Sequence, residues 1–172
     1  MKTTVVGIGN VLLGDDGAGV WLVHRLIAAY RFEPEIVLLD GCTLGLGLIS
    51  YLAETERLMV IDAAKTGSPP GTLAVLGERD VPASLRTMLS THEASLSDLL
   101  AALTLLGRAP REFVAIGIEP QSLAPGIVLS APVRATLARA ESEVIERLGA
   151  WGIAGERTHA TTPVDAFASR LF

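Results

Sequence analysis

The sequence predicts one α/β domain, in which a mostly parallel sheet is covered by helices on both faces. Short apolar segments rich in β-branched residues alternate with amphipathic helical segments along the chain. These expected strands are apolar on both faces, which is typical of parallel sheets between helices. The chain has 172 residues, 49% of them hydrophobic, so it can bury a core without a disulfide or a structural metal. We expect the domain to cover residues 1–149, with residues 150–172 as an unassigned tail.

The first unit of strand and helix lies at the N-terminus. We expect a strand over residues 3–6, then a glycine-containing loop, and a helix that ends at about residue 30. Apolar residues recur at helical spacing in that helix, for example Val20, Val23 and Leu26. The helix therefore has one apolar face that can pack on the sheet.

The second and third units repeat this order. Residues 35–39 form the second expected strand, and residues 44–53 form the helix that follows it. The third expected strand covers residues 57–61 and ends in Asp62. Repeated units of this kind predict that these three strands are parallel.

The fourth expected strand, residues 72–76, breaks the pattern. Only residues 63–71 separate it from the third strand, whereas a parallel crossover needs about a dozen residues or more. We therefore expect this strand to be antiparallel and to lie at an edge of the sheet. The remaining expected elements are a loop over residues 77–94, a helix that ends near residue 107, a fifth strand over residues 112–118 and a long helix over residues 132–149.

Charge and cysteine content argue against several classes of protein. The net charge of -5 and the pI near 5.2 argue against a nucleic-acid-binding protein and against binding to anionic membranes, since both use basic surfaces. No apolar run approaches the roughly 20 residues of a membrane-spanning helix, and the N-terminus does not resemble a signal peptide. We therefore expect a cytoplasmic protein. Cys42, the single cysteine, excludes an intramolecular disulfide and a cysteine-rich zinc site.

Acidic residues follow the first three expected strands. Ligands of parallel sheets bind beyond the carboxyl ends of the strands, where the strand order reverses. A right-handed double wind puts the first and third strands beside that point, so Asp16 and Asp62 are expected to converge there. Each acid has an alternative role, because Asp16 could cap the first helix and Asp62 could bind backbone donors of the next turn. Asp40, after the second strand, has a similar structural alternative.

His92 is the histidine best placed to join these acids, because it stands in the long loop before a helix. Its position alone is compatible with a metal ligand or a general base, and equally with an ordinary loop residue that has no role in the site. Two carboxylates and an imidazole suit a divalent transition metal such as zinc, nickel, iron or manganese. Such a metal could polarise a carbonyl or activate a bound water.

The glycine-rich start also permits a nucleotide-binding module. Gly7 and Gly9 begin like a dinucleotide fingerprint, and Asp40 stands where a ribose-binding acid could lie. Leu12, however, occupies the third glycine position, and the acidic pair before the helix would repel a pyrophosphate. For Cys42, a buried and unreactive thiol is the expected reading rather than a nucleophile.

Several segments of the chain form a set that occurs together in one known family. They are Gly7-Ile8-Gly9-Asn10, Asp15-Asp16-Gly17-Ala18-Gly19-Val20, Asp40-Gly41-Cys42-Thr43-Leu44-Gly45, Val60-Ile61-Asp62-Ala63, His92, and Pro120-Gln121-Ser122-Leu123. Together these segments resemble the hydrogenase maturation endopeptidases. The resemblance covers about residues 3–149. It implies a three-layer α/β/α sandwich with a five-stranded mixed sheet and one antiparallel edge strand.

The resemblance also implies an activity and a set of site residues. Such enzymes remove a short C-terminal extension from the precursor of the nickel-iron hydrogenase large subunit, after nickel has been inserted. Asp16, Asp62 and His92 match the nickel-contacting and catalytic positions, and Asp16 is Glu in part of the family. The substrate-binding box is Asp40, Gly41, Cys42, Thr43 and Gly45.

The same resemblance defines the expected cofactors and partners. The nickel is supplied by the precursor, no organic cofactor is expected, and the protein is expected to be a monomer. Two rival interpretations remain, namely a nucleotide-binding module and a hydrogenase assembly factor that binds the precursor without cutting it.

Overall fold

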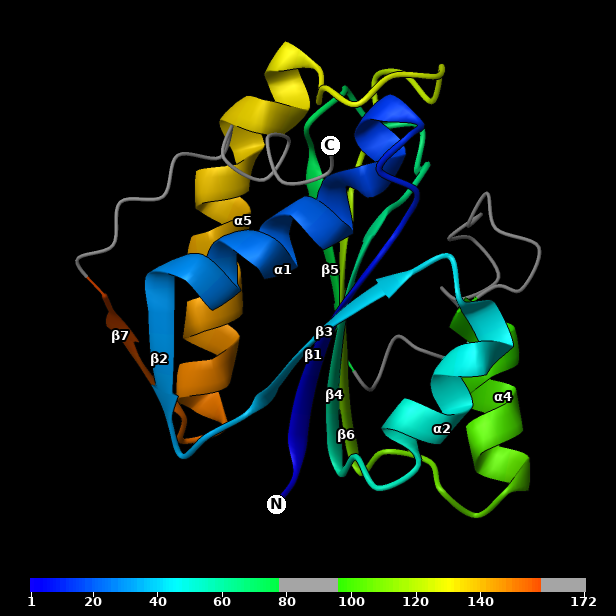
Figure 1. Cartoon of the computed structure of the whole chain (residues 1–172), viewed down its shortest axis with the longest axis vertical. Coiled ribbons are helices and arrows are strands. Elements are labelled where there is room, and N and C mark those ends of the chain that lie inside the picture. Colours follow the sequence, from blue (N-terminus) through cyan, green and yellow to red (C-terminus); the bar gives the residue numbers. More distant parts are fainter. Residues whose placement is uncertain (78–95, 159–172) are drawn as a thin grey trace.

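The computed structural model describes residues 1–77 and 96–158, which form three layers around a central sheet (Figure 1). The five-stranded sheet has the order β3-β1-β4-β6-β5. Its strands are β1 (Thr3–Ile8), β3 (Val37–Cys42), β4 (Arg57–Ala63), β5 (Leu73–Gly77) and β6 (Glu112–Ile118). β1 pairs in parallel with β3 and β4, β4 pairs in parallel with β6, and β5 is antiparallel to β6. The predicted mixed sheet with one antiparallel edge strand is therefore confirmed.

Helices cover both faces of this sheet (Figure 1). On one face lie α1 (Ala18–Ala29) and α5 (Ala131–Ala150). On the other lie α4 (Leu96–Leu105) and the short turn and helix η2 (Gly45–Leu48) and α2 (Ile49–Leu52). Alternate residues of each strand supply the two cores, because neighbouring side chains point to opposite faces. In β4, Met59 and Ile61 pack with α1 and α5, while Leu58 and Val60 pack with α2 and α4.

A second, two-stranded sheet was not expected from the sequence. β2 (Tyr30–Glu33) pairs antiparallel with β7 (Ala154–Arg157). The first helix therefore ends at Ala29, and β2 occupies the segment between it and β3. Part of the unassigned tail is ordered in this sheet, and Ile153 before β7 is only 3% exposed. Burial alternates along β2, so that Tyr30 and Phe32 pack against the main core. The strand has only four residues, which is too short for this alternation to be recognised in the sequence.

A buried carboxylate ties the second sheet to the helices. Glu141 on α5 is 5% exposed and accepts hydrogen bonds from Arg25 on α1 and from the Tyr30 hydroxyl, the latter at 2.8 Å. Arg157 on β7 lies 3.6 Å from the same carboxylate. Two consecutive elements from the first part of the chain, α1 and β2, and two from the last part, α5 and β7, therefore share one charge-assisted cluster.

Two facing glycines set how closely α1 approaches the sheet. A Cβ at Gly19 would overlap the Ile61 carbonyl and lie 2.6 Å from the Ile8 carbonyl oxygen. A Cβ at Gly7 would overlap the Gly19 carbonyl. The start of α1 therefore lies directly over the ends of β1 and β4, where only a residue without a side chain fits.

We expect Gly19→Ala to destabilise the protein by about 1–3 kcal/mol, because the added methyl group meets backbone atoms that cannot move aside independently. Gly149→Ala is the matched control, since a Cβ at Gly149 meets no atom within 4 Å. Alanine in that helix should be neutral or stabilising by up to about 1 kcal/mol. Urea unfolding of both variants measures the difference, and equal stabilities would contradict the close-packing argument.

Candidate functional site

Two acidic side chains meet at the carboxyl end of the parallel strands. Asp62 lies near the end of β4, and Asp16 lies in the 3-10 turn η1 (Gly14–Gly17) that follows β1. β1 and β4 are adjacent and in register, with Gly7 beside Ile61. Asp16 is 1% exposed and Asp62 is 8% exposed. The predicted convergence of these acids is therefore seen, and the Asp16 charge acts on Asp62.

Burial is the main influence on the Asp62 carboxyl group. It raises the pKa of Asp62 from 3.8 to about 7, and the nearby Asp16 charge acts in the same direction. A hydrogen bond of 2.8 Å from the Ala63 amide to Oδ1 opposes this rise. Asp62 therefore holds its proton until near neutral pH, so it can accept or release a proton there. A bound cation would replace that proton and offset the repulsion between the two acids.

Asp16 is held by the loop after β1. The Asn10 amide donates a hydrogen bond of 2.8 Å to its Oδ2. Gly9 adopts a φ of 135°, and a Cβ there would overlap the Asp16 carbonyl oxygen. Asp16 does not stand at the cap position of the first helix, since the N-cap of α1 is Gly17.

The neighbouring Asp15 has a different task. Its Oδ2 accepts hydrogen bonds from the amides of Gln121 (2.8 Å) and Ser122 (3.1 Å), and its Oδ1 accepts one from the Ser130 amide (2.6 Å). Asp15 is 1% exposed. This carboxylate therefore fixes both ends of the loop between β6 and α5 beside the acid pair. Sequence reasoning missed this role, because its partners are more than 100 residues away along the chain.

The glycine-rich loop does not form an open phosphate cradle. η1 packs directly on Gly9, and a Cβ at Gly17 would lie 2.8 Å from the Val11 Cα. The two buried carboxylates of Asp15 and Asp16 occupy the place where a dinucleotide fingerprint would present amides to a pyrophosphate. This geometry argues against the nucleotide-binding interpretation.

The predicted substrate-binding box lies at the end of β3, beside the β1 loop. Asp40 Oδ1 accepts a hydrogen bond of 3.0 Å from the Cys42 amide, and the Gly9 amide donates one of 2.9 Å to the Cys42 carbonyl. These bonds join the box to the loop that holds Asp16. Gly41 packs closely, since a Cβ there would lie 2.7 Å from Val6 Cγ2. Thr43 and Gly45 continue the box into η2.

One side chain at this box was predicted wrongly from the sequence, and one contact was not foreseen. The expectation that Cys42 is buried is wrong, because it is exposed, with a left-handed φ of 43°. Cys42 is the last residue of β3, and its thiol lies outside the core. His24 on α1 contacts Asp40, with 2.7 Å between Nε2 and Oδ2. This hydrogen bond is the main cause that lowers the pKa of Asp40.

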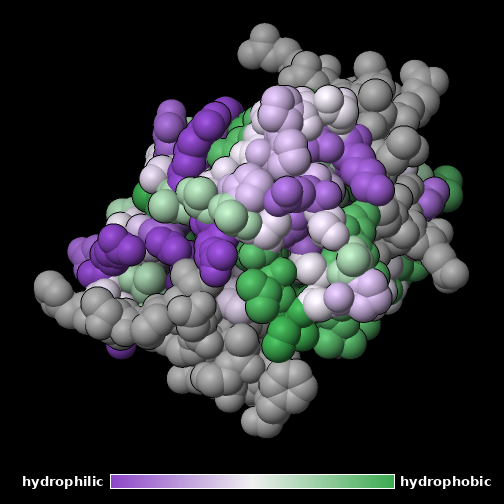
Figure 2. Space-filling model, turned by 90° about the horizontal axis from the view of Figure 1, so that it is seen from above, coloured by the Kyte–Doolittle hydropathy of each residue, from purple (hydrophilic) through white to green (hydrophobic). Residues whose placement is uncertain are grey.

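Exposed apolar side chains surround the same end of the sheet. Leu12 is 58% exposed and Val128 is 65% exposed, and the loops that carry them are joined by the bond from the Gly126 amide to the Leu12 carbonyl. Leu44 and Leu46, after β3, are 49% and 47% exposed. Figure 2 views the molecule from this end and shows hydrophobic side chains beside hydrophilic ones. We call these four leucine and valine residues the apolar rim, which suits contact with a protein.

His92, the third predicted site residue, lies outside the described residues. Within residues 1–77 and 96–158, no group of three or more histidine, cysteine, aspartate or glutamate side chains is arranged to hold a metal ion. The structure therefore brings two of the three predicted ligands together.

None of the helices in the same ranges combines the length and hydrophobicity that a membrane-spanning helix needs.

The raised pKa of Asp62 leads to a testable pH dependence of stability. Because the folded protein binds the Asp62 proton more tightly than the unfolded chain does, this contribution is largest below pH 3.8 and is lost as the pH rises to about 7. Urea unfolding of the metal-free protein should show this loss of stability, and Asp62→Asn should remove it.

Asp40→Asn is the control of opposite sign. The pKa of Asp40 is lowered on folding, so its contribution is present above pH 3.8 and is lost in acid. If the pH profiles of Asp62→Asn and the unaltered protein were parallel, the assignment of a raised pKa to Asp62 would be wrong.

Comparison with known proteins places the chain in a family. The family model for hydrogenase maturation proteases, HycI, matches residues 20–147. The hydrogenase 2 maturation protease of Escherichia coli (strain K12) is 34% identical over 154 residues, which are 89% of this chain and 94% of that protein. The hydrogenase expression/formation protein HupD of Rhodobacter capsulatus is 38% identical over 154 residues, covering 88% and 73% of the two chains.

Solved structures agree with this assignment. The hydrogenase maturating endopeptidase HybD from Escherichia coli superposes with a TM-score of 0.84 at 33% identity, covering 91% of this chain and 98% of HybD. The hydrogenase maturation protease HycI from Thermococcus kodakarensis, at 23% identity and a TM-score of 0.70, shares the fold. The predicted resemblance is confirmed, and the chain belongs to the hydrogenase maturation protease family.

Proposed function

We propose that this protein is an endopeptidase that removes a short C-terminal extension from the nickel-loaded precursor of a nickel-iron hydrogenase large subunit. Membership of the hydrogenase maturation protease family supports the reaction class. The observation that carries the proposal is the buried pair of Asp16 and Asp62 at the mouth of the sheet. The apolar rim around that mouth supports a protein as the substrate.

Nickel held by the precursor is the recognition element in this proposal. Two buried carboxylates repel one another, and a divalent cation that contacts both offsets this repulsion. Oxygen and nitrogen donors suit nickel among the divalent transition metals. Docking of a metal-loaded precursor is therefore favoured over docking of a metal-free one, and the protease needs no resident metal or organic cofactor.

His92 is the proposed third contact to the nickel. Leu96, the first residue of α4, lines the same small cavity as Asp62. His92 precedes Leu96 by four residues, which span at most about 14 Å when extended. The chain is therefore long enough for this imidazole to reach the acid pair.

Asp62 is the proposed general base for peptide hydrolysis in the alternative arrangement in which the nickel contacts Asp16 and not Asp62, since a carboxylate bound to a divalent cation does not keep a pKa near 7. A water molecule attacks the scissile carbonyl, and Asp62 takes the proton that this water loses. When the carbon–nitrogen bond breaks, the same proton passes to the leaving amine. A pKa of about 7 matches this exchange near neutral pH. Asp16, fixed by the Asn10 amide, stays as the metal contact, and the box from Asp40 to Gly45 borders the extended peptide.

Replacing the site residues separates hydrolysis from simple binding. We expect Asp16→Asn, Asp62→Asn and His92→Ala each to slow processing by roughly 100-fold or more. Asp62→Asn removes a positioned base, which contributes about that factor, and the other two remove contacts to the nickel that positions the precursor. Asp16→Glu is the conservative control and should retain activity. Mass spectrometry of the precursor measures its shortening. A precursor that is bound by the unaltered protein and keeps its full length would instead indicate a non-catalytic assembly factor.

The source of the metal can be tested with two preparations of each protein. Protease treated with EDTA and then freed of chelator should process nickel-loaded precursor at an unchanged rate, because the nickel belongs to the precursor. Precursor prepared without nickel should not be shortened by either protease preparation. Loss of activity in the EDTA-treated protease, restored by added metal, would contradict nickel as a feature of the substrate.

A further inference from the structure

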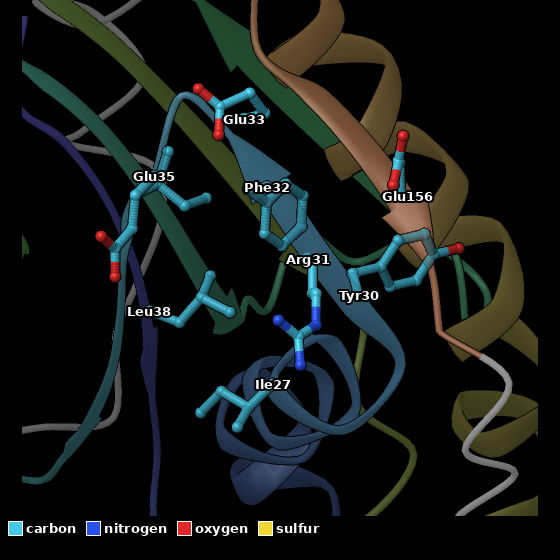
Figure 3. Close-up of a pocket in the computed structure, with 9 residues that line it drawn as sticks. Ile27, Tyr30, Arg31, Phe32, Glu33, Glu35, Leu38 and Glu156 are labelled. Carbon is cyan, nitrogen blue, oxygen red and sulfur yellow. The ribbon is translucent and has the colours of Figure 1, made fainter.

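A groove lies beside the sheet, away from the acid pair. It has a volume of about 630 Å³ and is lined by the end of α1, by β2, by β3 and by Glu156 of β7. Figure 3 shows Ile27, Phe32 and Leu38 around the hollow, with Glu35 on the β3 side and Glu156 on the β7 side. Ile27 is 50% exposed, so an apolar side chain in the groove is open to solvent.

Two strand edges border this groove. Within the described part of the chain, β3 pairs only with β1 and β2 pairs only with β7. Each strand therefore has one edge whose backbone groups are not used by a neighbouring strand. An extended peptide can pair with such an edge, and pockets beside the edge then select its side chains.

The charge of the groove favours a basic side chain in that peptide. Arg31 and Glu156 are directly opposite on β2 and β7, but no ion pair joins them, and Figure 3 shows the Arg31 guanidinium turned into the hollow beside Ile27. One basic and three acidic side chains therefore line the groove, which leaves it net acidic. Neither Glu33 nor Glu35 forms an ion pair with any residue in 1–77 or 96–158. The groove therefore combines apolar contacts with two acidic groups at its β2–β3 side.

The groove is continuous with the substrate-binding box along two elements. On α1, Ile27 lies about one turn after His24, and His24 contacts Asp40. On β3, Leu38 lies two residues before Asp40 and on the same face of the strand. A peptide that crosses the box therefore has a direct path along β3 into the groove.

From these observations we propose that the groove between α1, β2 and β3 binds an extended segment of the hydrogenase large-subunit precursor that carries a lysine or arginine beside an apolar residue. This inference rests on the proposed function, because it places part of the same substrate. Its role is binding rather than hydrolysis, since no groove residue lies at the acid pair. A substitution in the groove should therefore change KM and leave kcat unchanged.

The test is steady-state processing of nickel-loaded precursor by Glu35→Lys. We expect KM to rise roughly five- to tenfold with little change in kcat, because a complementary charge is reversed at a binding surface. The difference should shrink at high salt. Glu146→Lys is the matched control, since it makes the same charge change at an exposed position of α5 outside the groove, and its KM should stay unchanged.

A second measurement identifies the occupant directly. A photo-crosslinking amino acid placed at Ile27 should capture a precursor segment that contains lysine or arginine, as determined by mass spectrometry of the digest. Capture of residues 159–172 of this chain, or of a second copy, would overturn the inference. Equal KM values for Glu35→Lys and Glu146→Lys would overturn it too, while normal processing leaves the proposed function intact. Absence of processing by the unaltered protein would overturn both.

Discussion

The contact between the start of α1 and the ends of β1 and β4 is the constraint on which the site depends. Gly7 and Gly19 face each other there, and no side chain separates the helix from the strands. Because α1 begins so close to the sheet, η1 must turn sharply above it, and this turn brings Asp16 to Asp62. Backbone packing therefore places the two acids, rather than any attraction between them.

Three aspartates that follow strands in a similar way in the sequence make different contacts in the structure. Asp15 accepts three backbone hydrogen bonds and supports the loop between β6 and α5. Asp40 is held by His24 and orders the end of β3. Asp62 accepts one backbone hydrogen bond and is otherwise destabilised as an anion by burial. The carboxylates of Asp15 and Asp40 are stabilised by hydrogen-bond donors, whereas Asp62 has a raised pKa and can take part in proton transfer.

The sheet order around β1 could be predicted from the sequence, because apolar runs mark the strands and their alternation with helices indicates parallel pairing. The antiparallel edge strand could be predicted too, because the connection before it is too short for a parallel crossover. Sequence reasoning also brought Asp16 and Asp62 together, since the winding rule relates strands through topology. It missed β2 and β7, because each has four residues and pairs across most of the chain length. The partners of Asp15 and the exposure of Cys42 were missed for a similar reason, as tertiary contacts determine both. His92 stays a prediction.

Asp15 and Asp16 are consecutive, yet one carboxylate points to the loop after β6 and the other to the loop after β1. Most surface turns can gain or lose a residue, because the chain on either side adjusts. This turn has no such freedom, because a one-residue insertion or deletion within it would rotate the carboxylates by about a third of a turn, away from the amides that they contact. The contacts of Asp15 and Asp16 therefore fix the number of residues in this turn as well as their identity.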